Sequence, residues 1–147
     1  MTATSKPMSK LYARLSDPAR SGAYRVSHDR DIRDALASGD IDLVPISLGP
    51  GKEAMLAALA RSLGFPDWFG GNWDALEDCL TDLSWRADAP RVLLISGAVA
   101  GDDLGILVDI LSSAAESWRE RGKAFIAAFI DPPSQLALPA LYRERAG

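Results

Sequence analysis

Two short apolar segments on either side of a long helical pattern restrict how this chain can fold. They are RVLLIS at 91–96 and FIAAFI at 125–130, the second of which ends at Asp131-Pro132-Pro133. A strand that is buried on both faces of a sheet is apolar throughout, as the strands of parallel sheets are. Between the two segments, residues 104–118 carry apolar side chains at helical spacing. A helix that joins two parallel strands is therefore predicted.

The preceding residues extend this pattern. Residues 41–48 predict another strand, and Pro45 favours an edge position because proline cannot donate a hydrogen bond to a neighbouring strand. Helices are expected over 52–63 and 73–83, and residues 22–26 are a candidate for a fourth strand. The predicted fold class is α/β, with a small parallel sheet of three or four strands packed with helices.

The length of 147 residues corresponds to one domain. We expect this domain at residues 41–131, after an N-terminal extension at 1–40 and before a C-terminal tail at 132–147. The extension is expected to begin with a polar arm over 1–20, followed by a short strand and a helix at 32–37. The tail is expected to pack loosely on the surface.

Composition narrows the classes of protein that this chain can belong to. No apolar run approaches the ~20 residues of a membrane span, and the N-terminus lacks the apolar core of a secretory signal. The single cysteine, Cys79, excludes an internal disulfide or a cysteine-based zinc site and favours the reducing cytoplasm. A net charge of −4 argues against direct binding of nucleic acid.

The residues that enzymes commonly use for chemistry are scarce. His28 is the one histidine, and neither an H-E-x-x-H nor a G-x-S-x-G motif is present. The acids of residues 67–82 could bind Mg²⁺, but acids three and four apart on one helix form a stripe and do not converge. We therefore expect no enzyme activity, cofactor or metal, and a small metal-dependent enzyme is the least favoured alternative.

The charge distribution points to one segment. The 24 residues between Arg61 and Arg86 contain no Lys or Arg but five acids, so this segment holds the whole negative excess. On a helix over 73–83, the side chains Leu76, Cys79, Leu80 and Leu83 share one side. The opposite side, which we call the acidic face, consists of Asp74, Glu77, Asp78, Thr81 and Asp82.

The acidic face breaks local rules of helix stability. Asp74 and Asp78, like Asp78 and Asp82, are like charges four residues apart, where opposite charges would stabilise the helix by ~0.2–0.5 kcal/mol. Asp82 also lies near the C-terminus of the helix, which favours cations. Such a row of carboxylates can meet a groove lined with Lys and Arg that normally holds a phosphate backbone. The preceding loop, WFGG at 68–71, adds two aromatic side chains that could anchor an interface.

The segment LGFPDWFGGNWDALEDCLTDLSW at 63–85 resembles the barstar family of intracellular ribonuclease inhibitors. The order of strands and helices over 41–130 is also similar to that family. The residues that carry the resemblance are Pro66, Asp67, Trp68, Phe69, Gly70, Asn72, Trp73, Asp74, Ala75, Leu76, Asp78, Cys79 and Leu80.

The resemblance implies one-to-one binding of a secreted ribonuclease across its basic active-site cleft. By position, Asp74 and Asp78 would be the main carboxylates, with Asp78 deepest, and Trp68 would stack on the catalytic histidine of the nuclease. Asn72 and Gly70 would shape the loop. With the acidic face and the loop, the candidate partner-binding residues are Asp74, Asp78, Trp68, Glu77, Asn72, Gly70, Phe69, Asp82 and Thr81.

Departures from the family pattern suggest a different cognate nuclease or weaker binding, and the change at Glu77 together with the extra residues 1–40 keeps an alternative open. Glu77 stands where the best-known member of the family has an interfacial tryptophan. That member also uses an acid on its last helix. The corresponding position in this chain lies near Ser117, and Glu116 and Glu120 are the candidate substitutes. The first hypothesis is a cytoplasmic immunity protein that protects the producing cell from a ribonuclease toxin. The second is a protein-interaction module of the same fold without a ribonuclease target.

Overall fold

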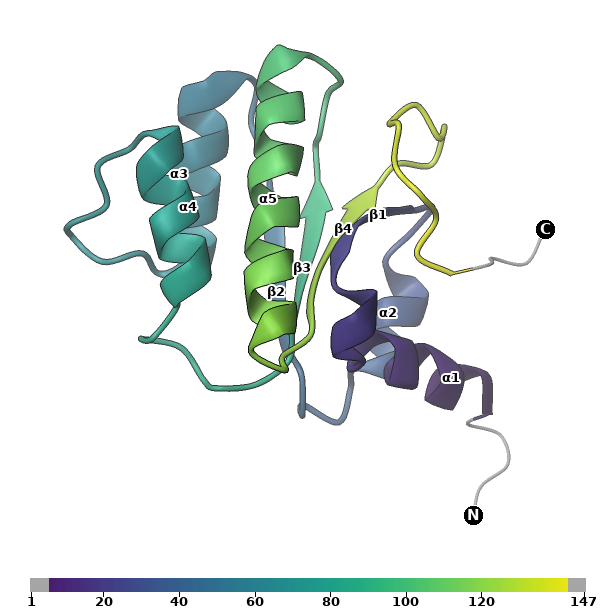
Figure 1. Ribbon diagram of the computed structural model, residues 1–147. Coiled ribbons are helices and arrows are strands. Elements are labelled where there is room, and N and C mark those ends of the chain that lie inside the picture. The colour runs from purple at the N-terminus through teal and green to yellow at the C-terminus, as the bar shows by residue number, and fades with distance from the viewer. Residues whose placement is uncertain (1–5, 143–147) are drawn as a thin grey trace.

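The computed structural model describes residues 6–142. Its centre is a sheet of four parallel strands in the order β1-β4-β3-β2 (Figure 1). The predicted α/β class and parallel sheet are thereby confirmed, including the fourth strand. The strands are β1 (Gly22–Val26), β2 (Asp42–Ser47), β3 (Arg91–Ser96) and β4 (Phe125–Ile130).

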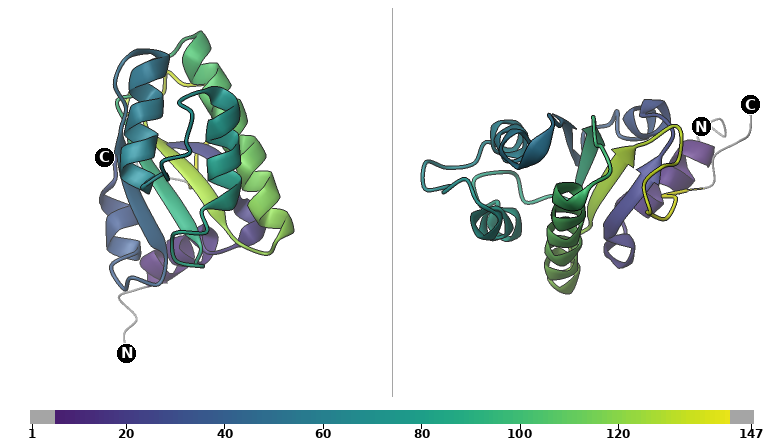
Figure 2. Two further views of the ribbon diagram at one scale, coloured as in Figure 1. Left: turned by 90° about the vertical axis from the view of Figure 1, so that its left-hand side faces the viewer. Right: turned by 90° about the horizontal axis from the view of Figure 1, so that it is seen from above.

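Helices cover both faces of the sheet (Figure 2). One face is covered by three helices, and the other by two helices from the N-terminal part of the chain, with a short 3-10 helix, η2 (Pro18–Arg20), before β1. The three are α3 (Gly51–Leu63), α4 (Trp73–Asp82) and α5 (Asp102–Glu120), and the two are α1 (Lys6–Leu15) and α2 (Arg30–Ala35).

Alternation along the strands divides the core into two layers. Ile46, Ile95 and Phe129 pack beneath α3, α4 and α5, whereas Leu94 and Ala128 pack beneath α1 and α2. The inner strands β3 and β4 are buried at their first five residues, as their apolar sequences predict. β2 is an edge strand, which confirms the expectation from Pro45.

Local sequence signals fix the ends of the helices that precede β3. Gly64 ends α3 in the left-handed conformation, with φ 67°, which glycine adopts without strain. The side chain of Asn72 accepts a hydrogen bond from the backbone N–H of Ala75 at 2.8 Å and so caps the start of α4. Leu83 ends α4 with φ 48°, a conformation that is uncommon for leucine.

The expectation of a polar arm at the N-terminus is wrong for residues 6–15, which form α1. This helix buries Leu11 and Leu15, which lie four residues apart and therefore on one face. The mixed polar and apolar sequence of this segment, KPMSKLYARL, gave too weak a helical pattern to predict it. The next helix begins at Arg30, two residues earlier than expected. Residues 1–5 of the predicted arm lie outside the described residues.

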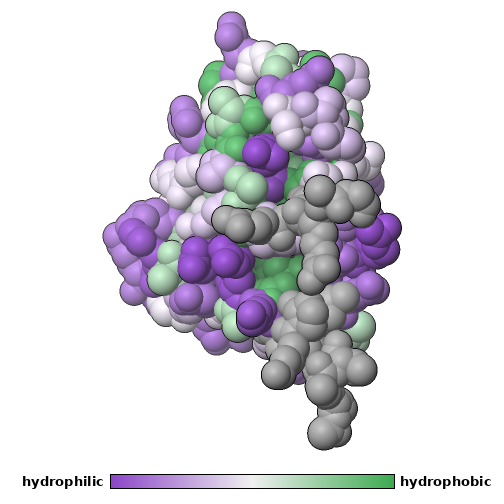
Figure 3. All heavy atoms as spheres, turned by 90° about the vertical axis from the view of Figure 1, so that its right-hand side faces the viewer, coloured by the Kyte–Doolittle hydropathy of each residue, from purple (hydrophilic) through white to green (hydrophobic). Residues whose placement is uncertain are grey.

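The C-terminal segment is attached more firmly than expected. Arg25 of β1 donates its backbone N–H to Pro139 and accepts one from Leu141, so Ala140 forms a parallel bridge beside β1. Leu141 is buried. Residues 143–147 of the predicted tail lie outside the described residues, and the boundaries at residues 40 and 131 stay a prediction. The side of the molecule that carries this segment mixes hydrophilic residues with small hydrophobic areas (Figure 3).

An ionic network links β2 and β3 at the N-terminal ends of these strands. Asp42 of β2 accepts hydrogen bonds from Arg86 at 2.9 Å and from Arg91 of β3 at 2.8 Å. The hydrogen bond from Arg86, together with that from Arg91, holds the pKa of Asp42 below its usual value against the opposing effect of burial. Arg91 is buried and also donates to the carbonyl oxygen of Ala87. The network thereby ties the segment after α4 to the sheet.

Candidate functional site

The two sides of α4 differ as the helical pattern predicts. Leu76, Cys79 and Leu80 have no exposed surface. Asp74, Asp78 and Asp82 of the acidic face are exposed. Since successive members lie four residues apart, these three carboxylates form a row along the helix.

The carboxylates of this row form no ion pairs in the described part of the chain. Among residues 6–142, no Lys, Arg or His side chain forms an ion pair with Asp74, Asp78 or Asp82. Their charge is therefore not cancelled by direct contact within the described structure, and the surface presents three closely spaced negative groups to solvent.

The other two members of the acidic face are engaged locally. Glu77 is half-buried, and its Oε2 atom accepts a hydrogen bond from the hydroxyl of Ser113 of α5 at 3.2 Å. The hydroxyl of Thr81 donates to two carbonyl oxygens of its own helix, that of Glu77 at 3.0 Å and that of Asp78 at 3.2 Å. Glu77 is thus held toward α5, and the Thr81 hydroxyl is turned to its own helix.

The C-terminal end of α4 is held by α5. Trp118 donates its indole N–H to the carbonyl oxygen of Leu80 at 2.8 Å, and Arg121 donates to that of Thr81 at 2.6 Å. The guanidinium of Arg121 also lies 3.8 Å from the centre of the Trp118 ring. These bonds satisfy carbonyls that a helix end leaves unpaired.

Arg121 changes the expected electrostatics of α4. The sequence of the helix has no basic residue, so Asp82 was expected to lie at a helix end without a compensating cation. Arg121 supplies that cation from 40 residues further along the chain, in favourable contact with the end of the helix dipole. Sequence reasoning missed this role because no short-range pattern connects the two positions.

The loop before α4 presents one of its two aromatic side chains. Trp68 is 58% exposed and leans edge-on against Trp85, with ring centres 6.3 Å apart. Phe69 is half-buried and packs edge-on against Phe65 at 4.9 Å. Trp85 itself donates its indole N–H to the carbonyl oxygen of Leu63. Trp68 is therefore available to a partner, whereas Phe69 supports the loop.

Gly70 and Asn72 form a compact junction between the loop and the helix. A Cβ atom added to Gly70 would lie 3.3 Å from the side-chain nitrogen of Asn72, which is closer than most such contacts. Gly71 has φ 71°, where residues with a side chain are strained. The two glycines thus let the chain turn tightly into the cap that Asn72 provides.

The acids considered for α5 are arranged in different ways. Glu116 pairs with Arg119 at 2.6 Å, and the hydroxyl of Ser117 accepts a hydrogen bond from Arg121 at 3.1 Å. Glu120 is exposed. Of the two acids near Ser117, Glu120 is therefore the one without an ion pair among the described residues.

The described residues offer no grouping of three or more His, Cys, Asp and Glu side chains that could hold a metal ion. None of the helices between residues 6 and 142 has the length and hydropathy needed to cross a bilayer. Cys79 lies beneath the acidic face, and its burial, with smaller effects from Asp78 and Asp82, raises the pKa of the thiol to about 11.

Comparison with known proteins identifies the family of this chain. Residues 49–130, more than half of the chain, match the family model described as Barstar (barnase inhibitor). A search of curated proteins finds no match. The matched residues include α3, the aromatic loop, α4, β3, α5 and β4, and hence every candidate partner-binding residue. The chain belongs to the Barstar family.

Proposed function

We propose that this protein inhibits a barnase-like extracellular ribonuclease by inserting the acidic face of α4 and the loop before it into the basic active-site cleft. Asp74 and Asp78 occupy positions that RNA phosphates otherwise take, and Trp68 packs against the nuclease at the edge of the cleft. Complexes form one-to-one in the cytoplasm and protect the producing cell.

The observation that carries this proposal is the row of exposed carboxylates without ion pairs among the described residues. Aspartates four residues apart on a helix destabilise it slightly, so their presence needs a compensating role. Arginine side chains form short, often bidentate hydrogen bonds with carboxylates, as they do with phosphates. A cleft built for RNA is therefore chemically suited to this face.

The proposal is tested with Asp78→Ala against a panel of small basic ribonucleases of the barnase type, with RNA cleavage as the readout. Loss of Asp78 leaves buried arginines of the nuclease without a partner, which costs about 2–5 kcal/mol of binding free energy. We expect inhibition to weaken by about 30-fold or more.

Asp34→Ala is the matched control, because Asp34 is an exposed acid on α2 and its loss changes the net charge equally. We expect it to alter inhibition by less than about twofold. Equal effects of the two substitutions would disprove the assignment of the site. Failure of the wild-type chain to inhibit any ribonuclease of the panel would disprove the function.

The mode of binding also predicts the kinetics. A contact of standard size, about 1,600 Å², with opposite charges on the two sides should associate quickly at low salt. Salt screens charges over about 10 Å at 0.1 M, so the association rate should fall steeply as salt is added.

A second function is favoured by one specific observation. Glu77 replaces the interfacial tryptophan of the best-known family member and is held by Ser113, so the apolar part of the contact is smaller here. The same surface would then serve as an interaction module for another basic protein. Co-purification from the native host separates the two: a secreted basic nuclease supports inhibition, and a different partner supports the module.

A further inference from the structure

α4 and α5 lie side by side, and their C-termini are at the same end of the molecule (Figure 1). Ser113 and Ser117 of α5 and Arg121 directly after it follow one another at intervals of four residues, so they share one side of this helix. That side borders the acidic face, since Ser113 donates to Glu77 and Arg121 donates to the carbonyl oxygen of Thr81. Arg121 therefore belongs to the same surface as the row of carboxylates.

The guanidinium of Arg121 is held in place by contacts that use only part of it. Its Nη2 atom donates to the carbonyl oxygen of Thr81 at 2.6 Å and to the hydroxyl of Ser117 at 3.1 Å, and the group lies 3.8 Å from the centre of the Trp118 ring. The Nη1 atom donates no hydrogen bond within residues 6–142, and the side chain is exposed. A guanidinium that is already ordered loses little freedom when it donates to a further acceptor.

The charge of Arg121 is not neutralised by an acid of the described chain. The neighbouring basic side chains Arg119 and Lys123 pair with Glu116 and Asp88. Arg121 forms no ion pair within residues 6–142. The surface thus presents the row of carboxylates along α4 and a fixed positive charge at the C-terminal end of that helix.

A cleft that is basic throughout does not match this arrangement of charges. A lysine or arginine of the partner opposite Arg121 would place two like charges together in the interface, which is unfavourable. A carboxylate at that position would instead accept hydrogen bonds from Nη1 of Arg121. Charges that repel the wrong partners are a common source of specificity.

We propose that Arg121 determines which ribonuclease this protein binds, by pairing with an acidic side chain at the rim of the nuclease cleft. This inference rests on the proposed function and specifies the chemistry of its partner. The matching cleft is basic opposite the carboxylate row and carries a carboxylate opposite Arg121.

Double-mutant cycles with a ribonuclease of the panel that the wild type inhibits test this proposal. In the nuclease, each acidic residue at the rim of the cleft is replaced in turn by its amide, and in this chain the substitution is Arg121→Gln. Dissociation constants are measured for every pair. We expect Arg121→Gln to weaken binding to the unaltered nuclease by about fivefold or more, and by less than about twofold once one particular acid has been replaced.

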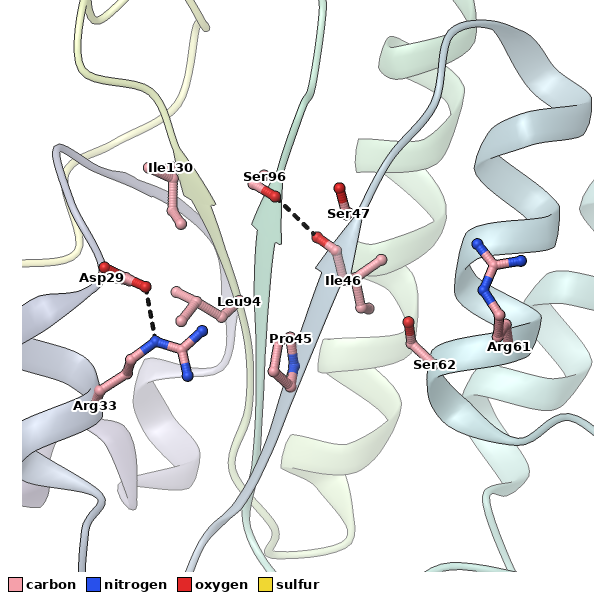
Figure 4. Close-up of a pocket in the computed structure, with 10 residues that line it drawn as sticks. All are labelled: Asp29, Arg33, Pro45, Ile46, Ser47, Arg61, Ser62, Leu94, Ser96 and Ile130. Carbon is pink, nitrogen blue, oxygen red and sulfur yellow. Dashed lines mark hydrogen bonds and ion pairs between the residues drawn. The ribbon is translucent and has the colours of Figure 1, made fainter.

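Arg33→Gln is the matched control, because it removes the same charge from an exposed position on the opposite face of the sheet. Arg33 of α2 donates to Asp29 at 2.7 Å and lines a pocket of about 340 Å³ beside β2 (Figure 4). We expect this variant to bind within about twofold of the wild type. Thermal unfolding of both variants checks that the fold is kept.

The outcomes separate this inference from the proposed function. If Arg121→Gln weakens binding equally for every nuclease variant, Arg121 only holds the end of α4, and its role in specificity is wrong. An effect no larger than that of Arg33→Gln would overturn that role as well, while inhibition by the wild type would still support the proposed function. If the wild type inhibits no ribonuclease of the panel, the proposed function fails and this inference with it.

Discussion

Cys79 shows how the acidic face affects the residue beneath it. The thiol has no exposed surface, and Asp78 and Asp82 add to the effect of burial on its pKa, which lies at about 11. At pH 8 about a thousandth of the thiol is then ionised, and the thiolate is the form that reacts. Cys79 thus behaves as a small apolar side chain that fills the space under α4.

This predicts that Cys79 reacts with a disulfide reagent such as DTNB only when the protein opens. At pH 8 without denaturant, we expect less than a tenth of the thiol to be labelled in the time that unfolded protein takes to react fully. Absorbance of the released thiolate measures this directly. Rapid labelling of the native protein would show that the helix does not cover the thiol as described.

The sequence predicted the exposure of some residues of the site but not the contacts of others. Helical spacing placed Asp74, Asp78 and Asp82 on one exposed side correctly, because a helix fixes direction from position alone. The spacing could not predict that Glu77 bonds to Ser113, since that contact depends on how two helices pack.

At the scale of elements, the start of α4 depends on one side chain. Asn72 caps the helix by accepting the N–H of Ala75 at 2.8 Å. Asn72→Ala removes this acceptor, for which we expect a loss of about 1 kcal/mol in the free energy of unfolding. For a domain of this size the melting temperature should fall by about 2–4 °C.

Asn72→Ser is the control for the cap, because a serine hydroxyl can also accept from the first turn of a helix. Denaturant unfolding of the two variants should place Asn72→Ser between the wild type and Asn72→Ala. Equal stability of Asn72→Ala and the wild type would contradict the role of this hydrogen bond.

Elements with strong local signals were predicted to within a residue or two. The bounds of β3 and β4 were predicted as observed, since both are apolar runs between turn residues. α1 was not predicted because only Leu11 and Leu15 are buried between residues 10 and 15, and two positions make a weak helical pattern. The bridge at Ala140 was not predicted because a single paired residue leaves no periodic pattern. The strand order likewise depends on long-range pairing that local patterns do not contain.

At the scale of the molecule, the network around Asp42 couples folding to pH. A pKa that is lowered in the folded state adds stability that is fully present above the ordinary carboxyl pKa of about 3.9. That contribution is lost as the pH falls through the lower folded value. Asp42 is largely buried beside Arg91, so solvent weakens the interaction less than it would at the surface.

Asp42→Asn should therefore have two effects on the free energy of unfolding. At pH 7 it should fall by about 3 kcal/mol or more, because the buried guanidinium of Arg91 loses its counter-charge. Between pH 5 and 2 it should fall less steeply than that of the wild type. Urea unfolding across this range measures both effects.

Asp88→Asn is the comparison for this prediction, since Asp88 pairs with Lys123 at 3.5 Å at an exposed position. Surface pairs of this kind contribute about 0–1 kcal/mol. Equal losses for the two substitutions at pH 7 would contradict the structural role of Asp42.

The position of α1 and of the segment paired with Arg25 has a practical consequence. Both lie on the side of the sheet away from α4, so the chain approaches both of its ends on that side (Figure 1). A biotin group or a fluorescent reporter fused at either end would leave the carboxylate row facing outward. The molecule can thus be anchored to a sensor surface on that side while the carboxylate row stays accessible to the proposed nuclease partner in flow.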